Sequence, residues 1–249
     1  SAVWWSVIVA ARSAAANDQE RALVEQLDAW NGDHPLDSVA ATLFNQLTYQ
    51  LAREAMADEL GDAFFDSLLQ TRAIDSALPR LTANADSPWW NRQGSEQREG
   101  RAQIVAEAWR ASLEHLRSVF GDDAAAWTWG RGHTLTHNHP LGQQQPLAWL
   151  LNVGPLAAPG GHEMPNNLSH RVGPAPWPVV YGPSTRRLVD LGNADKSLGG
   201  IPVGQSGVPF DAHYGDQASA HVTGTYQPQH FSEADVKAHR QGTLRLLPR

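Results

Sequence analysis

GQSGVP (residues 204–209), HYGDQ (213–217) and GTYQP (224–228) follow one another closely and are the most informative part of the sequence. The glycines of the first motif favour a positive φ or the close approach of another backbone segment. Asp216 is predicted to cap a short helix at its N-terminus, and Tyr214 to pack against one end of that helix. We therefore expect this stretch to have a structural role.

Four further motifs precede it in a fixed order: DSPWW (86–90), WTWGRGH (127–133), Gly160-Gly161 followed by Asn166 or Asn167, and YGPSTR (181–186) leading to Asp190. Together the five segments resemble the penicillin acylase family of N-terminal-nucleophile hydrolases, in the C-terminal part of the family's large subunit. The resemblance implies an α+β fold, namely the C-terminal part of an αββα sandwich with a helical first half and a strand- and loop-rich second half.

The same resemblance implies hydrolysis of a linear acyl amide, such as a β-lactam side chain or an acyl-homoserine lactone. It also implies two obligatory partners, a companion small subunit and the upstream part of the large subunit, and a periplasmic or secreted location. This chemistry requires no cofactor, although some family members bind structural Ca²⁺, which would lie elsewhere in the complete enzyme. We assign no metal ligand and no cofactor-binding residue.

The candidate catalytic residue is Ser1. In the family the first residue of the large subunit is a Ser whose own α-amino group serves as the base, and Ser1-Ala2-Val3-Trp4 resembles that start. Ala2 stands where the family has Asn, and the pattern from Asn17 onward already resembles the late helical region of the subunit. The alternative is that Ser1 is only a boundary residue. Asn166 and Asn167 are assigned structural roles.

Composition limits the class of protein. The 249 residues contain ten Trp and no Cys, which excludes a disulfide framework and a thiolate metal site. Residues 1–123 hold 10 Lys/Arg against 19 Asp/Glu, whereas the remainder has a small positive balance and 9 of the 11 His. No basic patch appears, so nucleic acid is not an expected partner. No apolar run reaches the roughly 20 residues of a membrane span.

The pattern of apolar residues divides the chain into a helical region over 1–121 and a region of strands, loops and short C-terminal helices over 122–249, within one structural unit. The predicted helices begin at Asn17, at Asp37 or Ser38, near Phe64 and near Gln97, and a last one begins at Ser232. The predicted strands are 127–129, 179–181 and 188–191.

Two other functions remain open at this point. His133, His137 and His139, with His162 further on, could hold a metal ion in a hydrolase. Exposed Trp side chains could instead serve a non-catalytic interaction module. Ser206 does not lie in the G-x-S-x-G pattern of a nucleophile elbow, so we predict a turn in which its hydroxyl bonds a neighbouring backbone group.

Overall fold

A computed structural model describes residues 2–162, 164–240 and 242–248. They fall into two compact units, each built from two segments of the chain. Unit 1 comprises residues 1–135 and 157–181, and unit 2 comprises residues 136–156 and 182–249. The predicted division at residue 121 is not tested by this grouping and stays a prediction.

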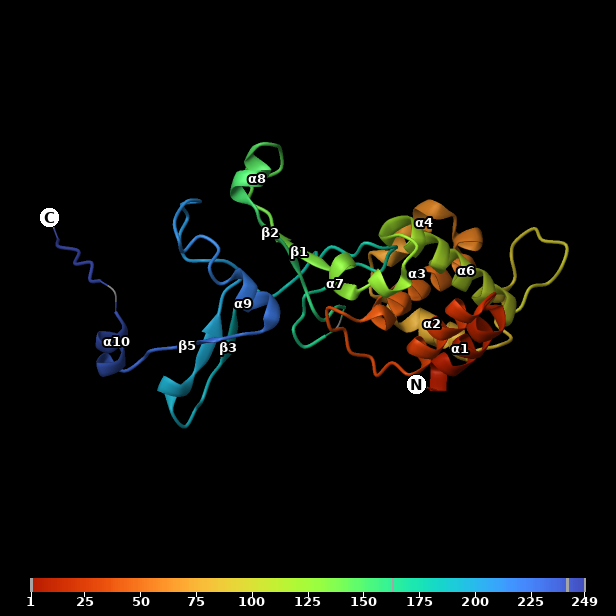
Figure 1. The fold of residues 1–249 in the computed structure, drawn as a ribbon, viewed down its shortest axis with the longest axis horizontal. Coiled ribbons are helices and arrows are strands. Elements are labelled where there is room, and N and C mark those ends of the chain that lie inside the picture. Colours follow the sequence, from red (N-terminus) through yellow and green to blue (C-terminus); the bar gives the residue numbers. More distant parts are fainter. Residues whose placement is uncertain (1, 163, 241, 249) are drawn as a thin grey trace. The chain divides into compact units, whose positions relative to one another are not determined.

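Unit 1 is mainly helical. Its elements are α1 (Ala2–Ala14), α2 (Asp18–Asp28), α3 (Val39–Leu60), α4 (Asp62–Leu69), α5 (Ala73–Ala83), η1 (Pro88–Trp90), α6 (Arg101–Phe120), η2 (Ala124–Ala126) and α7 (Trp129–Gly132). The two longest helices, α3 and α6, lie side by side, and α1 packs on α6 (Figure 1). The helix-rich first half predicted from the sequence is confirmed.

Local signals explain where these helices begin and end. The Asn17 side chain accepts the Glu20 N–H at 2.9 Å, and Glu20 reaches back to Ala16, as in a capping box. The Ser38 hydroxyl accepts an N–H of the first turn of α3. α3 ends at Gly61, which has a φ of 72° that side-chain-bearing residues rarely adopt. The helix starts at Asn17 and Ser38 were both predicted.

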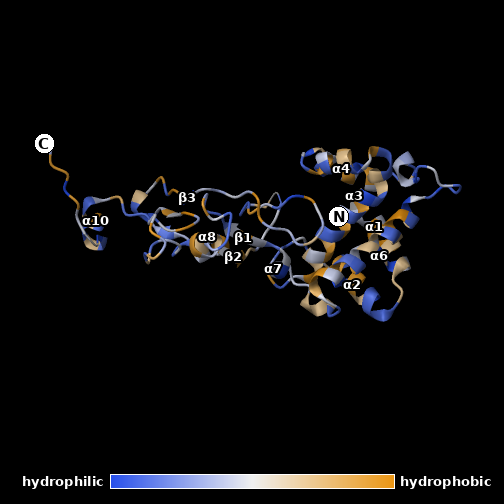
Figure 2. Cartoon of the chain, turned by 90° about the horizontal axis from the view of Figure 1, so that it is seen from above, coloured by the Kyte–Doolittle hydropathy of each residue, from blue (hydrophilic) through white to orange (hydrophobic). Residues whose placement is uncertain are grey.

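The core of unit 1 forms between apolar stripes of its helices, along which hydrophobic and hydrophilic residues alternate as orange and blue bands (Figure 2). Leu43, Leu47 and Leu51 recur every four residues on α3 and are completely buried. Ile104 and Leu116 of α6 belong to the same core cluster. Burying one such side chain contributes about 1.5–3 kcal/mol, so this cluster holds the helices together.

The structure corrects three expectations in unit 1. α1 and α5 are helices that we did not predict, and α6 begins at Arg101 rather than near Gln97. The strand expected at 127–129 is wrong, because Trp127 directly follows η2 and Trp129 is the first residue of α7, and both are buried. Their alternation reflects two indoles packing into the helical core, not a sheet with one exposed face.

Small sheets and short helices make up the rest. The strands are β1 (Thr134–His137) with β2 (Val153–Ala157), and a three-stranded antiparallel sheet of β3 (Arg186–Leu188), β4 (Leu198–Gly200) and β5 (Gln227–Pro228). The remaining helices are α8 (Leu147–Leu151), η3 (Ala194–Lys196), α9 (Ala218–Thr223) and α10 (Glu233–His239). Register places Arg186 opposite Gly200 and Leu198 opposite Pro228. α10 begins after Ser232, as predicted.

Two strand predictions in this half are wrong in extent. Residues 179–181 form only an isolated bridge, between Ser169 and Tyr181. The strand expected at 188–191 lies earlier, because the Asp190 carboxylate accepts the Gly192 and Asn193 N–H groups and turns the chain there. Within the described ranges, no helix combines the length and apolar character needed to cross a membrane.

Candidate functional site

The indole of Trp129 is the centre of an aromatic and imidazole cluster in unit 1. It stacks on His133 with ring centroids 4.7 Å apart, and it contacts the edges of His34 at 5.1 Å and His170 at 5.4 Å. Its Nε1–H donates to the Gly160 carbonyl at 2.8 Å. The WTWGRGH and Gly160-Gly161 motifs therefore meet at this point.

Hydrogen bonds fix the tautomers of the three buried histidines. The Asn45 amide donates to Nε2 of His34 at 3.0 Å, so the Nδ1–H of His34 donates to Gly32. The Asn45 carbonyl accepts from Nε2 of His170 at 3.2 Å. His133 donates from Nδ1 to Ala158 at 2.7 Å. Each ring is thereby a neutral imidazole that carries one proton.

The electrostatics agree with these neutral forms. Burial lowers the pKa of His34 and of His133. For His170, burial and then repulsion from His133, His162 and His34 lower the pKa to about 3. Nε2 of His133 and Nδ1 of His170 are buried with no hydrogen-bond partner in the described structure. The cluster therefore presents two unused acceptor nitrogens.

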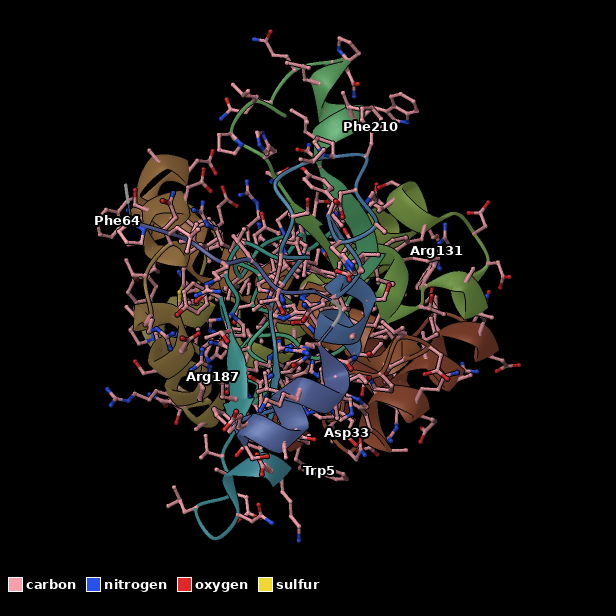
Figure 3. The ribbon with its side chains drawn as sticks, turned by 90° about the vertical axis from the view of Figure 1, so that its left-hand side faces the viewer. Trp5, Asp33, Phe64, Arg131, Arg187 and Phe210 are labelled. Atoms are coloured by element: carbon pink, nitrogen blue, oxygen red, sulfur yellow. The ribbon has the colours of Figure 1, made fainter. Side chains whose placement is uncertain are left out.

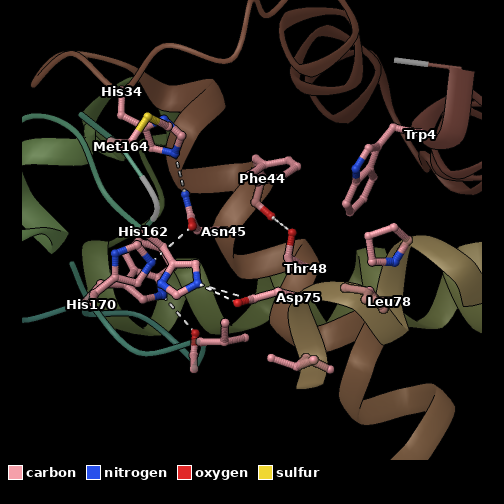
Figure 4. A pocket seen from close by; sticks show the side chains of 15 residues that line it. Trp4, His34, Phe44, Asn45, Thr48, Asp75, Leu78, His162, Met164 and His170 are labelled. Carbon is pink, nitrogen blue, oxygen red and sulfur yellow. Dashed lines mark hydrogen bonds and ion pairs between the residues drawn. The ribbon is translucent and has the colours of Figure 1, made fainter. Parts of the chain in front are cut away.

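A pocket of about 260 Å³ opens beside this cluster (Figure 4). Its walls are mostly apolar, and the His34–Asn45–His170 chain forms its polar end. The lining residues are Trp4, His34, Phe44, Asn45, Thr48, Ile74, Asp75, Leu78, Pro79, His162, Met164, His170, Val172, Gly173 and Trp177. Such a cavity suits an apolar group with a hydrogen-bonding end.

An ion pair forms part of the pocket wall. Nε2 of His162 lies 3.1 Å from both carboxylate oxygens of Asp75, the first acidic residue of α5 (Figure 4). Both side chains are about one-third exposed. An exposed pair of this kind contributes at most about 1 kcal/mol, so its effect is to fix the loop around Gly161 against α5.

The pocket contains no activated nucleophile among its described residues. Thr48 carries the only hydroxyl of the lining, and that hydroxyl donates to the Phe44 carbonyl at 2.7 Å. No neighbouring imidazole accepts a proton from it. The site can bind and orient an apolar group, but these residues by themselves do not constitute acyl-transfer machinery.

The C-terminal motifs form a structural turn in unit 2. The N–H groups of Gly204 and Ser206 donate to the carbonyls of Tyr214 and His213 at 3.0 and 3.1 Å. A Cβ at Gly204 would lie 1.6 Å from the His213 carbonyl oxygen. The predicted close approach is confirmed at Gly204 but not at Gly207, where a Cβ would meet open space. The Ser206 hydroxyl accepts the Val208 N–H, as predicted.

Asp216 does not cap α9, which corrects our expectation. That helix starts at Ala218 and has no side-chain cap. The Asp216 carboxylate instead accepts from Nδ1 of His213 at 2.8 Å, which raises the pKa of His213. Tyr214 is half-buried, and its hydroxyl donates to the Leu151 carbonyl at 2.5 Å. Asp216 therefore bonds the His213 side chain in place of a backbone N–H at the start of α9.

Arg186 links the YGPSTR motif to α9. Its guanidinium donates to the His221 carbonyl, and burial lowers the pKa of Arg186. Burial, followed by repulsion from Arg186 and His137, lowers the pKa of His221 to about 4. In this part of unit 2 the motif residues hold backbone segments together, so their role is structural.

Ser1, the candidate nucleophile, lies outside the described residues, so its role stays a prediction. Asn167 has a φ of 50° in a turn that its N–H closes on Met164. His133 donates to the Ala158 carbonyl, 25 residues away, and His139 accepts the Leu141 N–H. Neither belongs to a metal-binding group in the described parts of the chain. The His34–Asn45–His170 chain was missed, because isolated residues so far apart have no periodic signal.

Most of the tryptophans serve the core. Trp90, Trp109, Trp127, Trp129 and Trp177 are at most 2% exposed. Four of these five donate their indole N–H to a backbone carbonyl. Trp5 and Trp149 are the most exposed of those described, at 57% and 83% (Figure 3 labels Trp5). Of the DSPWW pair, Trp90 is 1% exposed and Trp89 37%.

Comparison with known proteins identifies the family. Residues 3–238 match the family model described as penicillin amidase. The chain belongs to the penicillin amidase family. This confirms the resemblance inferred from the five motifs, all of which lie in the matched range.

Several curated relatives of this penicillin amidase chain are acylases. It is 26% identical over 239 residues to the acyl-homoserine lactone acylase QuiP of Pseudomonas aeruginosa. It is 28% identical over 242 residues to QuiP of Pseudomonas syringae pv. tomato, and 25% identical over 232 residues to the penicillin acylase 2 proenzyme of Pseudomonas sp.. These alignments cover 87%, 94% and 91% of this chain. The chain spans 28–29% of the length of these relatives.

A solved structure is similar to this penicillin amidase chain over most of its length. It is the thermostable penicillin G acylase from Alcaligenes faecalis, with 16% identity and a TM-score of 0.47. The alignment covers 99% of this chain and 46% of that protein. The similarity is too low to add weight, so the family assignment rests on the sequence match.

Proposed function

We propose that this chain is part of an amidohydrolase that cleaves a linear acyl amide and releases a carboxylic acid and an amine. The family match over residues 3–238 carries the proposal. The names of the relatives, acyl-homoserine lactone acylase and penicillin acylase, supply the two substrate classes. In this proposal the described residues act as a scaffold, since the pocket beside Trp129 holds no activated nucleophile.

The proposal includes the remaining parts of the enzyme. The chain spans about 28% of its relatives' length, so we propose that activity requires an upstream part of the large subunit and a companion small subunit. We further propose that this chain forms the C-terminal part of an αββα sandwich and that the enzyme is periplasmic or secreted. The chemistry needs no cofactor, and any structural Ca²⁺ would bind outside this chain.

The test uses the complete protein and two substrates, an N-acyl-homoserine lactone and a penicillin. Mass spectrometry would identify the products. An acylase releases the free amine from each amide it cleaves, whereas a lactonase leaves the amide intact and opens the ring. Release of neither free amine, in a protein whose circular dichroism shows it to be folded, would overturn the proposal.

The role of Ser1 requires a separate experiment. If Ser1 is the nucleophile, Ser1→Ala abolishes hydrolysis without changing the melting temperature, and one added N-terminal residue does the same by blocking the α-amine. The matched control is Ser13→Ala on α1, whose exposed hydroxyl only bonds the Val9 carbonyl. Full activity in Ser1→Ala would make Ser1 a boundary residue and would leave the proposed reaction standing.

A further inference from the structure

Two imidazoles and one carboxylate converge in unit 2, outside all five family motifs. One ligand atom from each of His230, Asp235 and His239 lies within 4.8 Å of the other two. Nδ1 of His230 is 2.5 Å from Oδ2 of Asp235, and Nδ1 of His239 is 3.3 Å from Oδ1 of the same carboxylate. The two rings stack at 4.0 Å with planes 8° apart.

Backbone contacts on both sides hold His230 in place. The residue before it, Gln229, donates its N–H to the Ser197 carbonyl at 2.8 Å, directly after β5. The two residues after it donate their N–H groups to the Asp195 carboxylate, at 3.2 Å from Phe231 and 2.8 Å from Ser232. His230 therefore occupies a fixed position before α10 begins.

The contact with Asp195 also leaves the Asp235 carboxylate available to bind other groups than the backbone of the helix cap. Ser232 caps α10 and accepts the Asp235 N–H at 3.3 Å, which places Asp235 at the third helical position. In a capping box the acidic side chain at that position would bind the N–H of the cap residue. Asp195 already binds that N–H of Ser232, so Asp235 turns toward the imidazoles. His239, four residues later, lies on the same helix face.

We propose that His230, Asp235 and His239 form a binding site for a divalent transition-metal ion such as Zn²⁺. Two imidazole nitrogens and one carboxylate oxygen match the ligands that Zn²⁺ prefers, whereas Mg²⁺ and Ca²⁺ prefer oxygen alone. The ion replaces the Nδ1 protons of the two rings, of which His230 now donates to the Asp235 carboxylate and His239 to the Asp235 backbone carbonyl at 2.9 Å. Bond lengths of about 2.0–2.2 Å require the stacked rings to tilt apart, and His239, 55% exposed, is free to do so.

The open side of the cluster determines what kind of site it is. Three protein ligands leave a fourth tetrahedral position for water. The side chains of His230 and Asp235 are 31% and 29% exposed, so solvent reaches the ion. Such a site has one exchangeable ligand. The proposal does not depend on the proposed amide hydrolysis, because none of the three residues lies in the pocket of unit 1.

The test is equilibrium dialysis of the full chain against Zn²⁺, compared with the double variant His230→Gln/His239→Gln. We expect the unchanged chain to bind one more ion per molecule than the double variant. The matched control is His213→Gln, which removes an imidazole paired with a single carboxylate in the same unit and should keep the full stoichiometry. Binding should weaken in acid, because protons compete with the ion for the ligand nitrogens.

Two further variants keep the test valid if the double variant misfolds. Asp235→Asn keeps the side-chain shape and should lose the same ion. Asp195→Asn leaves all three ligands in place but releases their backbone support, and a loss of about tenfold in affinity is expected. Equal Zn²⁺ binding by the unchanged chain, the double variant and Asp235→Asn would overturn the proposal, as would displacement of the ion by Mg²⁺ at equal concentration.

Discussion

At the scale of single residues, the buried imidazoles of unit 1 make the free energy of unfolding sensitive to a drop in pH. His34, His133 and His170 each have a lowered pKa because burial disfavours the charged ring. Asn45 bonds both His34 and His170 in their neutral forms. Protonation would therefore place charges in the core and break this chain of hydrogen bonds.

The first prediction is that unit 1 loses stability in mild acid. The unfolded histidines take up protons near pH 6.5, whereas folded His170 does so only near pH 3. Stability is thus fully present above pH 6.5 and falls by up to about 1.4 kcal/mol per pH unit for each such histidine as the pH drops. Urea denaturation at pH 7, 6 and 5 would measure the free energy of unfolding. In His170→Gln, the slope of that free energy against pH should fall by the amount that corresponds to about one proton. An unchanged slope in that variant would contradict the assignment.

The second prediction concerns Gly204. Gly204→Ala would place a Cβ 1.6 Å from a backbone oxygen, so the turn that joins it to His213 must open. We expect a loss of about 1–3 kcal/mol, the range for a strained core substitution. Gly207→Ala is the control, because a Cβ there meets open space at an ordinary φ. Thermal denaturation of the two variants tests this prediction, and equal melting temperatures would show that Gly204 is not required for the turn.

Individual residues show how far sequence reasoning reaches. A side chain that bonds a backbone group close by in the sequence was interpreted correctly. Ser206 is an example, since its hydroxyl accepts the N–H of the residue two positions later. Asp216 was misinterpreted because its competitor, the His213 ring, offered a stronger charged hydrogen bond than a helix N–H. The bond between Asn45 and His170 joins residues 125 positions apart, and no local pattern encodes it.

At the scale of elements, boundaries were predicted well where caps are strong. Asn17 and Ser38 both lie at helix starts as expected. α5 was missed because Pro79 lies inside it, and a proline normally indicates a helix end. Short strands were misplaced by a few residues, since their positions depend on pairing with distant segments.

The third prediction tests the cap of α2. Asn17→Ala removes the acceptor for the Glu20 N–H and leaves that donor without its partner. The loss of stability should be about 1 kcal/mol. Gln19→Ala, at an exposed position of the same helix, is the control and should change stability by less than about 0.5 kcal/mol. Chemical denaturation of both variants makes the comparison, and equal midpoints would rule out the capping role.

At the scale of the whole molecule, motifs and the pattern of apolar residues predicted the family and the helical half, but not which distant segments pack together. The family and the helix-rich first half were both predicted from the sequence and are confirmed. The grouping of residues 157–181 with the first helices was not foreseen. That grouping depends on Trp129 and Gly160, 31 residues apart, and a periodic pattern cannot reveal such a contact.

The fourth prediction is that the 249-residue chain alone associates with itself. Leu191, Phe210 and Trp149 are all more than 80% exposed, and Trp5 and Phe64 more than 50% (Figure 3 labels Trp5, Phe64 and Phe210). Apolar side chains this exposed favour association. Light scattering should show concentration-dependent particles and a dye for apolar surfaces should bind. A monomer with one sharp cooperative melt would contradict this expectation.

The two units have a consequence for how the chain is made and cut. Each is discontinuous in sequence, and the chain passes from one to the other after residues 135, 156 and 181. A single proteolytic nick at any of these crossings leaves two covalent connections intact, so the halves stay tethered. A ribosome must also synthesise as far as residue 177 before Trp129 can contact both Gly160 and Trp177, so the helices made first lack these contacts until that segment is present.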